Sequence, residues 1–286
     1  MKALLLVLPL LIMAVSGCVF PGQTPGNGVV IVTFEPSFTT VYSGEPVDFR
    51  LKIQNQGTAD AVDVTPTIIG LETWDTKSST CDGWETIPAA VPEIGATGGS
   101  ANCRWTYAAP EIPKGLSTEI YTTARVHYEY RTSVVKSIIF ASSKELRLMK
   151  DRGEAIPAQT SSQTSGPLKI DIKTEAPVRF WESSVTFPIS ITVENTGDGV
   201  VCRSVGNCDP DDGLNTLSLV MEPGNDITIS DCETDIVLWQ GKTNTLVCQA
   251  TFSGLRDMGT AQRTLSINTN YGYYTDKTAK VTVKSR

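Results

Sequence analysis

The sequence contains a single histidine, His127, and no block of consecutive basic residues among its 286 amino acids. One histidine excludes a metal centre or an active site built from several histidines. Asp and Glu (31) outnumber Lys and Arg (24), so the formal net charge is −7. An acidic chain without a basic block is poorly suited to nucleic acid, and we expect no nucleic-acid partner. Gly-x-Ser-x-Gly, Walker and His-Glu-x-x-His motifs are also absent, which removes the common signatures of several enzyme classes.

The N-terminus carries an apolar run, Ala3–Val15, that is shorter than the ~20 residues needed to span a bilayer. Its length fits the core of a signal peptide over residues 1–17. The run ends in Val-Ser-Gly-Cys18, which resembles the lipobox of prokaryotic lipoprotein signal peptides. This resemblance implies cleavage before Cys18, lipidation of its thiol, and a location on the extracytoplasmic face of the cell membrane. The alternatives are an ordinary secretory signal, with Cys18 free or disulfide-bonded, and an uncleaved signal anchor, which the short apolar run disfavours. Residues 18–28, rich in Pro and Gly, are expected to form a flexible tether.

An internal repeat organises the rest of the chain. At an offset of 140 residues, apolar residues at every second position recur and lead into Asn-x-Gly: Val47, Phe49, Leu51, Ile53, Asn55 and Gly57, then Phe187, Ile189, Ile191, Val193, Asn195 and Gly197. This alternation predicts a strand with one buried face that ends in a turn. A Tyr-x-Tyr-x-Thr motif also recurs, and each copy of it is followed by a final alternating strand, Val134–Phe140 and Ala279–Val283.

About seven short strands in each copy predict an all-β protein of two tandem immunoglobulin-like antiparallel β-sandwiches. We expect the first sandwich over residues 29–142 and the second over residues 168–286, joined by residues 143–167. Within that connection, Ser142-x-x-Glu145 is a capping box that predicts a helix over Lys144–Arg152. The alternative is that this segment prolongs the preceding strand. Residues 158–167 are polar and of low complexity, which predicts a linker.

Seven cysteines is an odd number, and the repeat accounts for it. With Cys18 assigned to the lipid, two cysteines in each copy occupy corresponding places and the last two lie in an insertion of the second copy. This predicts the disulfides Cys81–Cys103, Cys232–Cys248 and Cys202–Cys208. The spacings lack the Cys-x-x-Cys pairs of zinc ribbons, so we expect no metal at these cysteines.

The tyrosines of the repeated motif have two interpretations. Tyr128 and Tyr130, and likewise Tyr271 and Tyr273, share one strand face and would form an exposed binding strip for a sugar or a protein. Their recurrence in both copies favours the alternative, in which they pack in each core. His127 corresponds to Asn270 in the second copy, so we interpret it as a surface or edge residue and expect no enzyme. Paired carboxylates for glycoside hydrolysis stay open at this stage.

An acidic segment follows Cys208. Its Asp209, Asp211, Asp212 and Asn215 offer the oxygen ligands that Ca²⁺ prefers, although their spacing is not that of an EF-hand loop. The alternative is a solvated turn within the insertion, because Asp, Pro, Gly and Asn are turn formers. No other cofactor is predicted.

The alternation ending in Asn55-x-Gly57 and Asn195-x-Gly197, each followed by small and β-branched residues, resembles CARDB-type adhesion-related domains. These are immunoglobulin-like modules of archaeal and bacterial surface proteins. The resemblance implies a non-enzymatic surface lipoprotein that acts in adhesion, protein–protein interaction or envelope structure, with envelope proteins or surface glycans as partners. Two alternatives are a carbohydrate- or calcium-dependent ligand-binding protein and an accessory subunit of a membrane secretion or filament machine.

Overall fold

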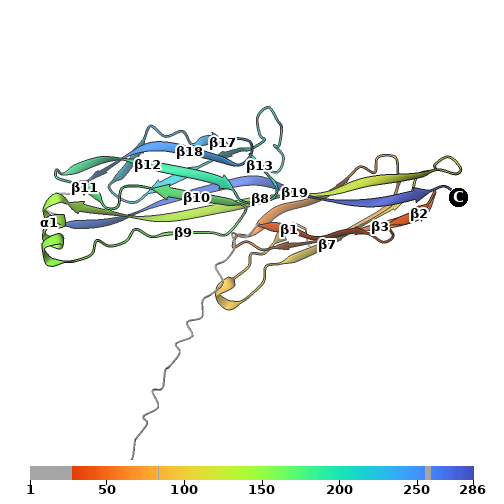
Figure 1. Ribbon diagram of the computed structural model, residues 1–286, viewed down its shortest axis with the longest axis horizontal. Coiled ribbons are helices and arrows are strands. Elements are labelled where there is room, and N and C mark those ends of the chain that lie inside the picture. Colours follow the sequence, from red (N-terminus) through yellow and green to blue (C-terminus); the bar gives the residue numbers. More distant parts are fainter. Residues whose placement is uncertain (1–27, 83, 255–258) are drawn as a thin grey trace, which may run out of the picture.

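The computed structural model describes residues 28–82, 84–254 and 259–286, and these form an elongated all-β protein (Figure 1). The predicted signal peptide, Cys18 and nearly all of the tether therefore lie outside the described residues. Among the described residues, no helix is long and apolar enough to cross a bilayer. The first part of the chain contains β1 (Val29–Pro36), β2 (Thr40–Tyr42), β3 (Pro46–Asn55), β4 (Ala61–Ile69), β5 (Asp75–Asp82), β6 (Thr86–Ile87), the 3₁₀ turn Pro92–Ile94, β7 (Ser100–Ala108) and β8 (Ser117–Ser142). The second part contains α1 (Ser143–Arg152), β9 (Ser161–Gln163), β10 (Leu168–Lys173), β11 (Val178–Phe180), β12 (Ser184–Asn195), β13 (Val200–Cys202), β14 (Thr216–Ser218), β15 (Val220–Pro223), β16 (Ile227–Ser230), β17 (Asp235–Val237), β18 (Thr243–Ser253) and β19 (Thr260–Lys284).

Two very long strands form the axis of the molecule. β8 has 26 residues and β19 has 25, and they pair antiparallel without a break from Ser117↔Lys284 to Ala141↔Thr260. At ~3.3 Å per residue this ribbon is roughly 80 Å long. It forms the centre of a nine-stranded sheet that runs through the whole molecule. Figure 1 shows α1 at one end of the resulting rod and the C-terminus at the other.

Each half of the ribbon is covered by a separate four-stranded sheet. The order β1-β3-β7-β5 covers one half, and β10-β12-β18-β16 covers the other. The alternating apolar residues of β3 and β12 lie in these two cores with at most 3% of their surface exposed, which confirms that part of the prediction. The protein is therefore built as two antiparallel β-sandwiches, as the fold class predicts, and the two sandwiches share one sheet.

The predicted domain bounds are wrong because the two copies exchange their last strands. The first copy was expected to keep Val134–Phe140, yet in the structure this segment pairs with residues 261–267 in the other half. In return, Ala279–Val283 of the second copy pairs with residues 118–122 in the first half. Neither 29–142 nor 168–286 is thus a self-contained sandwich. The second half lies within the continuous segment 131–275, which begins at Arg131, opposite Asn270, and ends just after the residues 272–274 that pair with β13.

The connection between the copies contains both a helix and a strand. α1 begins as the capping box predicts, with the Ser142 hydroxyl accepting a hydrogen bond from the Glu145 N–H (3.1 Å). It ends at Gly153, whose left-handed φ of 71° closes the helix. The predicted linker 158–167 is only partly a linker, because its β9 pairs antiparallel with Val134–Lys136 of β8. β8 offers backbone hydrogen bonds to β9 here, and the polar composition of the segment gave no indication of this pairing.

The six described cysteines form the three predicted disulfides, Cys81–Cys103, Cys202–Cys208 and Cys232–Cys248. The first joins the neighbouring strands β5 and β7, and the third joins the segment just after β16 to β18, the corresponding place in the other half. Their loops of 22 and 16 residues stabilise the folded state by about 3 kcal/mol each in the chain-entropy account.

Candidate functional site

The four tyrosines of the repeated motif meet at the middle of the ribbon, which we call the waist. Tyr130 lies opposite Tyr271 and Tyr128 lies opposite Tyr273, so the two copies of the motif face each other. All four are at most 2% exposed, and neighbouring ring centroids lie 5.6–6.5 Å apart. The exposed-strip interpretation is therefore wrong. The tyrosines are core residues, and they close the junction where the two sandwiches share one sheet.

Each tyrosine hydroxyl at the waist has a hydrogen-bond partner; Tyr271 pairs with the Thr132 hydroxyl (3.0 Å), and the partners of Tyr130 and Tyr273 follow the repeat. The Tyr128 hydroxyl accepts from the Val29 N–H (3.3 Å), and the Tyr130 hydroxyl accepts from the Ala59 N–H (3.2 Å). In the second copy, the Tyr273 hydroxyl accepts from the Gly199 N–H (2.8 Å). Because Val29 lies against Tyr128, the chain enters the described structure at the waist.

The two Asn-x-Gly turns border this cluster and make matching hydrogen bonds. In each, the asparagine Oδ1 accepts from the glycine N–H, and the amide group donates to two carbonyls. The contacts are Gly57 N (3.0 Å), Ala59 O (2.8 Å) and Ile87 O (3.0 Å) for Asn55, and Gly197 N (3.2 Å), Gly199 O (3.0 Å) and Gly241 O (3.1 Å) for Asn195. A Cβ at Gly57 would lie 1.9 Å from the Tyr130 hydroxyl, and one at Gly197 would lie 2.4 Å from that of Tyr273. The glycine of each Asn-x-Gly motif therefore allows its turn to pack directly against a tyrosine hydroxyl, where a larger residue would collide.

Burial raises the pKa of Tyr130 and of Tyr273 from 10.0 to about 12. The folded state therefore holds these protons more tightly than the unfolded chain. Their contribution to stability is complete below pH 10 and is lost as the pH rises through 12.

We expect an alkaline titration followed by phenolate absorbance to show a group of tyrosines ionising near pH 12, together with loss of the fold. In the Tyr273→Phe variant one fewer phenol ionises in that range, and stability falls less steeply with pH. Ionisation of every tyrosine at pH 10 in the still-folded protein would contradict the buried waist.

His127 lies on the outer face of the ribbon, as predicted, and it is half-buried there. Its ring is 5.3 Å from that of Tyr274, and Arg125 stacks on the same tyrosine ring at 4.0 Å. Arg125 also makes a two-point ion pair with Asp276 (2.7 and 2.8 Å). Burial and the neighbouring Arg125 lower the pKa of His127. The contacts of Arg125 and His127 with Tyr274 and Asp276 link β8 to β19 on this face.

The acidic segment after Cys208 folds as a turn. The Asp209 carbonyl accepts hydrogen bonds from the N–H groups of Asp212, Gly213 and Leu214, and Asp209, Asp211 and Asp212 are exposed. Asn215 adopts a left-handed φ of 58° at the end of the insertion. No three acidic, His or Cys residues of the described chain come together as a metal site. The solvated-turn interpretation describes the placement of these residues, and the calcium interpretation stays a prediction.

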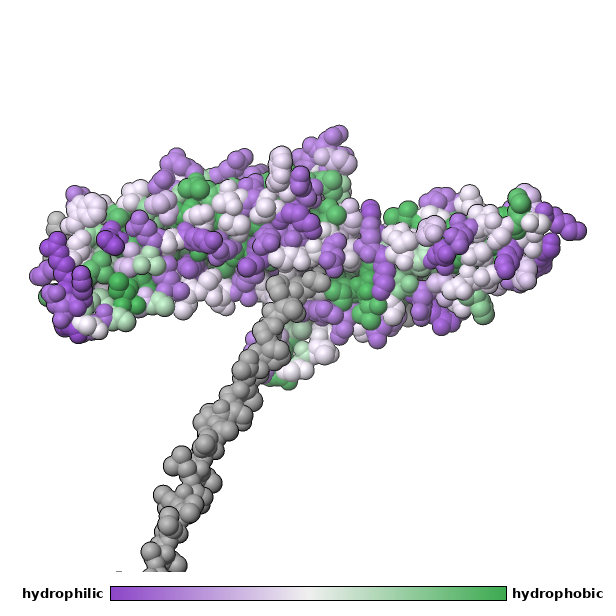
Figure 2. Space-filling view, in the orientation of Figure 1, coloured by the Kyte–Doolittle hydropathy of each residue, from purple (hydrophilic) through white to green (hydrophobic). Residues whose placement is uncertain are grey.

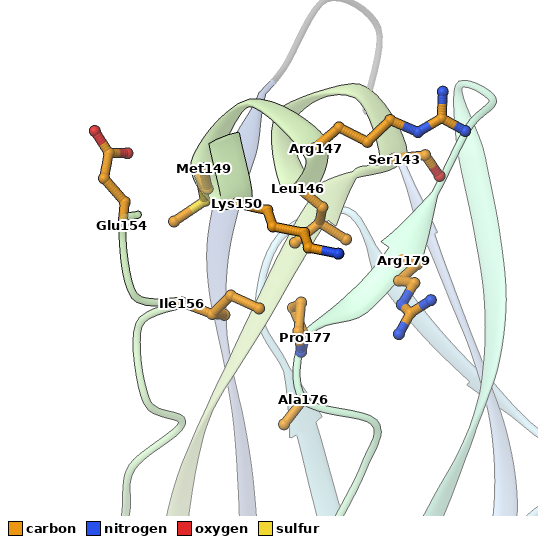
Figure 3. A pocket seen from close by; sticks show the side chains of 10 residues that line it. All are labelled: Ser143, Leu146, Arg147, Met149, Lys150, Glu154, Ile156, Ala176, Pro177 and Arg179. Atoms are coloured by element: carbon orange, nitrogen blue, oxygen red, sulfur yellow. The ribbon is translucent and has the colours of Figure 1, made fainter. Parts of the chain in front are cut away.

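A hollow that the sequence did not predict lies at the helix end of the rod (Figure 3). This tip hollow, of about 670 Å³, lies between α1 and the turn that leads into β11. Its apolar surface comes from Leu146, Met149, Ile156 and Pro177. Figure 2 shows the hydrophilic surface of α1 beside hydrophobic residues at this end.

Three cations surround the tip hollow. Arg147 and Lys150 project from α1, where a spacing of three residues places them on one helix face, and Arg179 projects from β11. In Figure 3, Arg147 and Arg179 lie on one side with Lys150 extended across the hollow. Glu154 lies on the opposite side, where its carboxylate pairs with Arg152 (2.8 Å). The sequence contained one indication of this site, because Arg147 and Lys150 are three residues apart on a helix with a predicted cap. It gave no indication that β11 would lie beside that helix.

Comparison with known proteins gives no family for this chain, since no family model and no curated protein matches it. Among solved structures it is similar to the secreted serine protease VesC from Vibrio cholerae, with 9% identity, a TM-score of 0.22, and coverage of 91% of this chain and 52% of that chain. It is also similar to the D0-D1 domain of intimin (10% identity, TM-score 0.16, coverage 89% and 98%). A third is the Enterococcus faecalis MSCRAMM ACE, which binds its ligands by the collagen Hug model (10% identity, TM-score 0.13, coverage 91% and 96%). Likeness at this level does not establish a shared function, and the chain spans about half the length of VesC.

Proposed function

We propose that the protein is a non-enzymatic lipoprotein of the extracytoplasmic membrane face, anchored through Cys18, that acts by contacts with other envelope proteins. The observation that carries this proposal is the unbroken β8–β19 ribbon, which makes two sandwiches into one stiff rod. The described chain begins at the waist of that rod, against Tyr128. A tether attached there leaves both ends of the rod free to meet partners.

The three disulfides support the proposed location, because disulfides persist in oxidising compartments outside the cytoplasm. The charge supports it as well. Removal of residues 1–17 takes away one charged residue, Lys2, and changes the net charge from −7 to −8. A strongly acidic surface keeps an exposed rod soluble.

We expect the Cys18→Ala variant to lose its lipid and to move from the membrane fraction to the soluble fraction. The physical reason is that each buried lipid CH₂ contributes ~0.8 kcal/mol to membrane binding, and no other anchor is proposed. Mass spectrometry of the N-terminal peptide and cell fractionation make the measurement. The matched control is Ser16→Ala, which keeps a small residue before the cleavage point and keeps the lipid. A Cys18→Ala protein that stays in the membrane would contradict the proposal.

A further inference from the structure

We propose that the tip hollow binds an acidic peptide segment of a protein partner. An apolar side chain of the segment enters the hollow, and its flanking carboxylates pair with Arg147, Lys150 and Arg179. This inference rests on the proposed function, in which the ends of the rod meet other proteins. It names the partner's chemistry and the residues that recognise it.

The charge at the tip is the first observation that supports an acidic partner. In the part of the chain that the structure describes, the side chains of Arg147, Lys150 and Arg179 have no ion pair or hydrogen bond. The neighbouring Arg152, by contrast, is held by both Glu145 (3.0 Å) and Glu154 (2.8 Å). Three unpaired cations gathered at one hollow of an acidic protein form a local field that attracts carboxylates.

The apolar surface is the second observation. Ile156 is 47% exposed at the tip hollow, and a second hollow of about 660 Å³ adjoins it through the shared residues Ala176, Pro177 and Arg179. That second hollow contains Trp181, which is 78% exposed. Trp and Arg are the residues most enriched where protein interfaces hold their binding energy. The two adjoining hollows thus form one continuous surface that can accommodate an extended peptide segment.

The shape favours a peptide over a membrane surface. Helices that bind membranes present a projecting apolar face that sinks into the lipid. At this end of the rod Leu146, Met149 and Ile156 line a hollow, and on α1 Met149 is 8% exposed while Leu148, which does not line the hollow, is 40% exposed. A flat bilayer would contact the cations around the hollow but would not reach the apolar residues inside it.

The test uses the full chain and an array of short synthetic peptides, each with one central apolar residue flanked by either Asp and Glu or Lys. We expect acidic peptides to bind and Lys peptides not to bind, with affinity falling as salt is raised. The double variant Arg147→Glu/Arg179→Glu should weaken binding at least about tenfold. The matched control is Lys169→Glu, an exposed cation on β10 next to the waist, which should leave binding unchanged.

Three results would overturn the inference. The first is an absence of binding by every acidic peptide, and the second is equal binding by the wild type and the double variant. The third is failure of the peptides together with binding to vesicles of anionic phospholipid that depends on Arg147 and Arg179. Thermal unfolding of each variant shows that it is folded. None of these results affects the lipid on Cys18, so failure of this inference is separate from failure of the proposed function.

Discussion

Residues 131–275 expressed by themselves will fold as a stable monomer, whereas residues 168–286, the second copy of the sequence repeat, will not. The reason is the exchange of strands. The 168–286 piece lacks Val134, Ile138 and Phe140 of β8, which are at most 1% exposed in the core that it would have to build. The Phe140 ring lies 4.2 Å from Phe252 and 5.4 Å from Phe187.

Losing three buried side chains removes roughly 5–9 kcal/mol of apolar burial. That is comparable to the whole stability of a typical domain, about 5–15 kcal/mol. Circular dichroism, thermal unfolding and size-exclusion chromatography of the two pieces make the measurement. As a control, 29–142 and 168–286 produced together should associate and fold, because each supplies the strand that the other lacks. A stable monomer of 168–286 alone would show that the shared ribbon is not required.

The Asn195→Ala variant will lose about 4 kcal/mol of unfolding free energy. Asn195 is 5% exposed, and its side chain satisfies the Gly197 N–H, the carbonyls of Gly199 and Gly241, and the Tyr273 hydroxyl (3.0 Å). A buried polar group left without a partner costs ~1–3 kcal/mol, and alanine leaves the Gly197 N–H and the Tyr273 O–H without this buried partner and two partly buried carbonyls without a donor. The expected fall in Tm is roughly 10 °C.

Two further variants sharpen this prediction, and chemical denaturation measures all three. Asn55→Ala removes the matching contacts of the first copy and should cost a similar amount, because the repeat preserves three of the four hydrogen bonds. Asn244→Ala removes one exposed hydrogen bond to the Val237 carbonyl (2.8 Å) and should cost less than ~1 kcal/mol. Equal losses for Asn195→Ala and Asn244→Ala would contradict the structural role of the Asn-x-Gly turn.

Local patterns predicted well what local forces decide. The alternation in β3 and β12, the cap at Ser142 and the three disulfides all depend on residues close in sequence or on the repeat. The sequence analysis placed a separate strand at Val134–Phe140 after the tyrosine motif, but β8 continues through both without a break. The sequence itself contained evidence against a break. From Tyr128 to Val134 the alternation continues without any Gly, Pro, Asn or Asp, so nothing there favours a turn.

The sequence by itself determined the buried faces of β3 and β12, the start of the helix at Ser142 and which cysteines pair. Only the tertiary structure decided which strand pairs with which. The same buried face of Val134–Phe140 fits a sandwich of its own copy or of the other, so the alternation is equal in both arrangements. Because β8 and β19 continue past the waist, each must complete the sandwich beyond it. This pairing of β8 with β19 buries the four tyrosines at the junction of the two sandwiches. It also brings α1 and β11 together around the tip hollow.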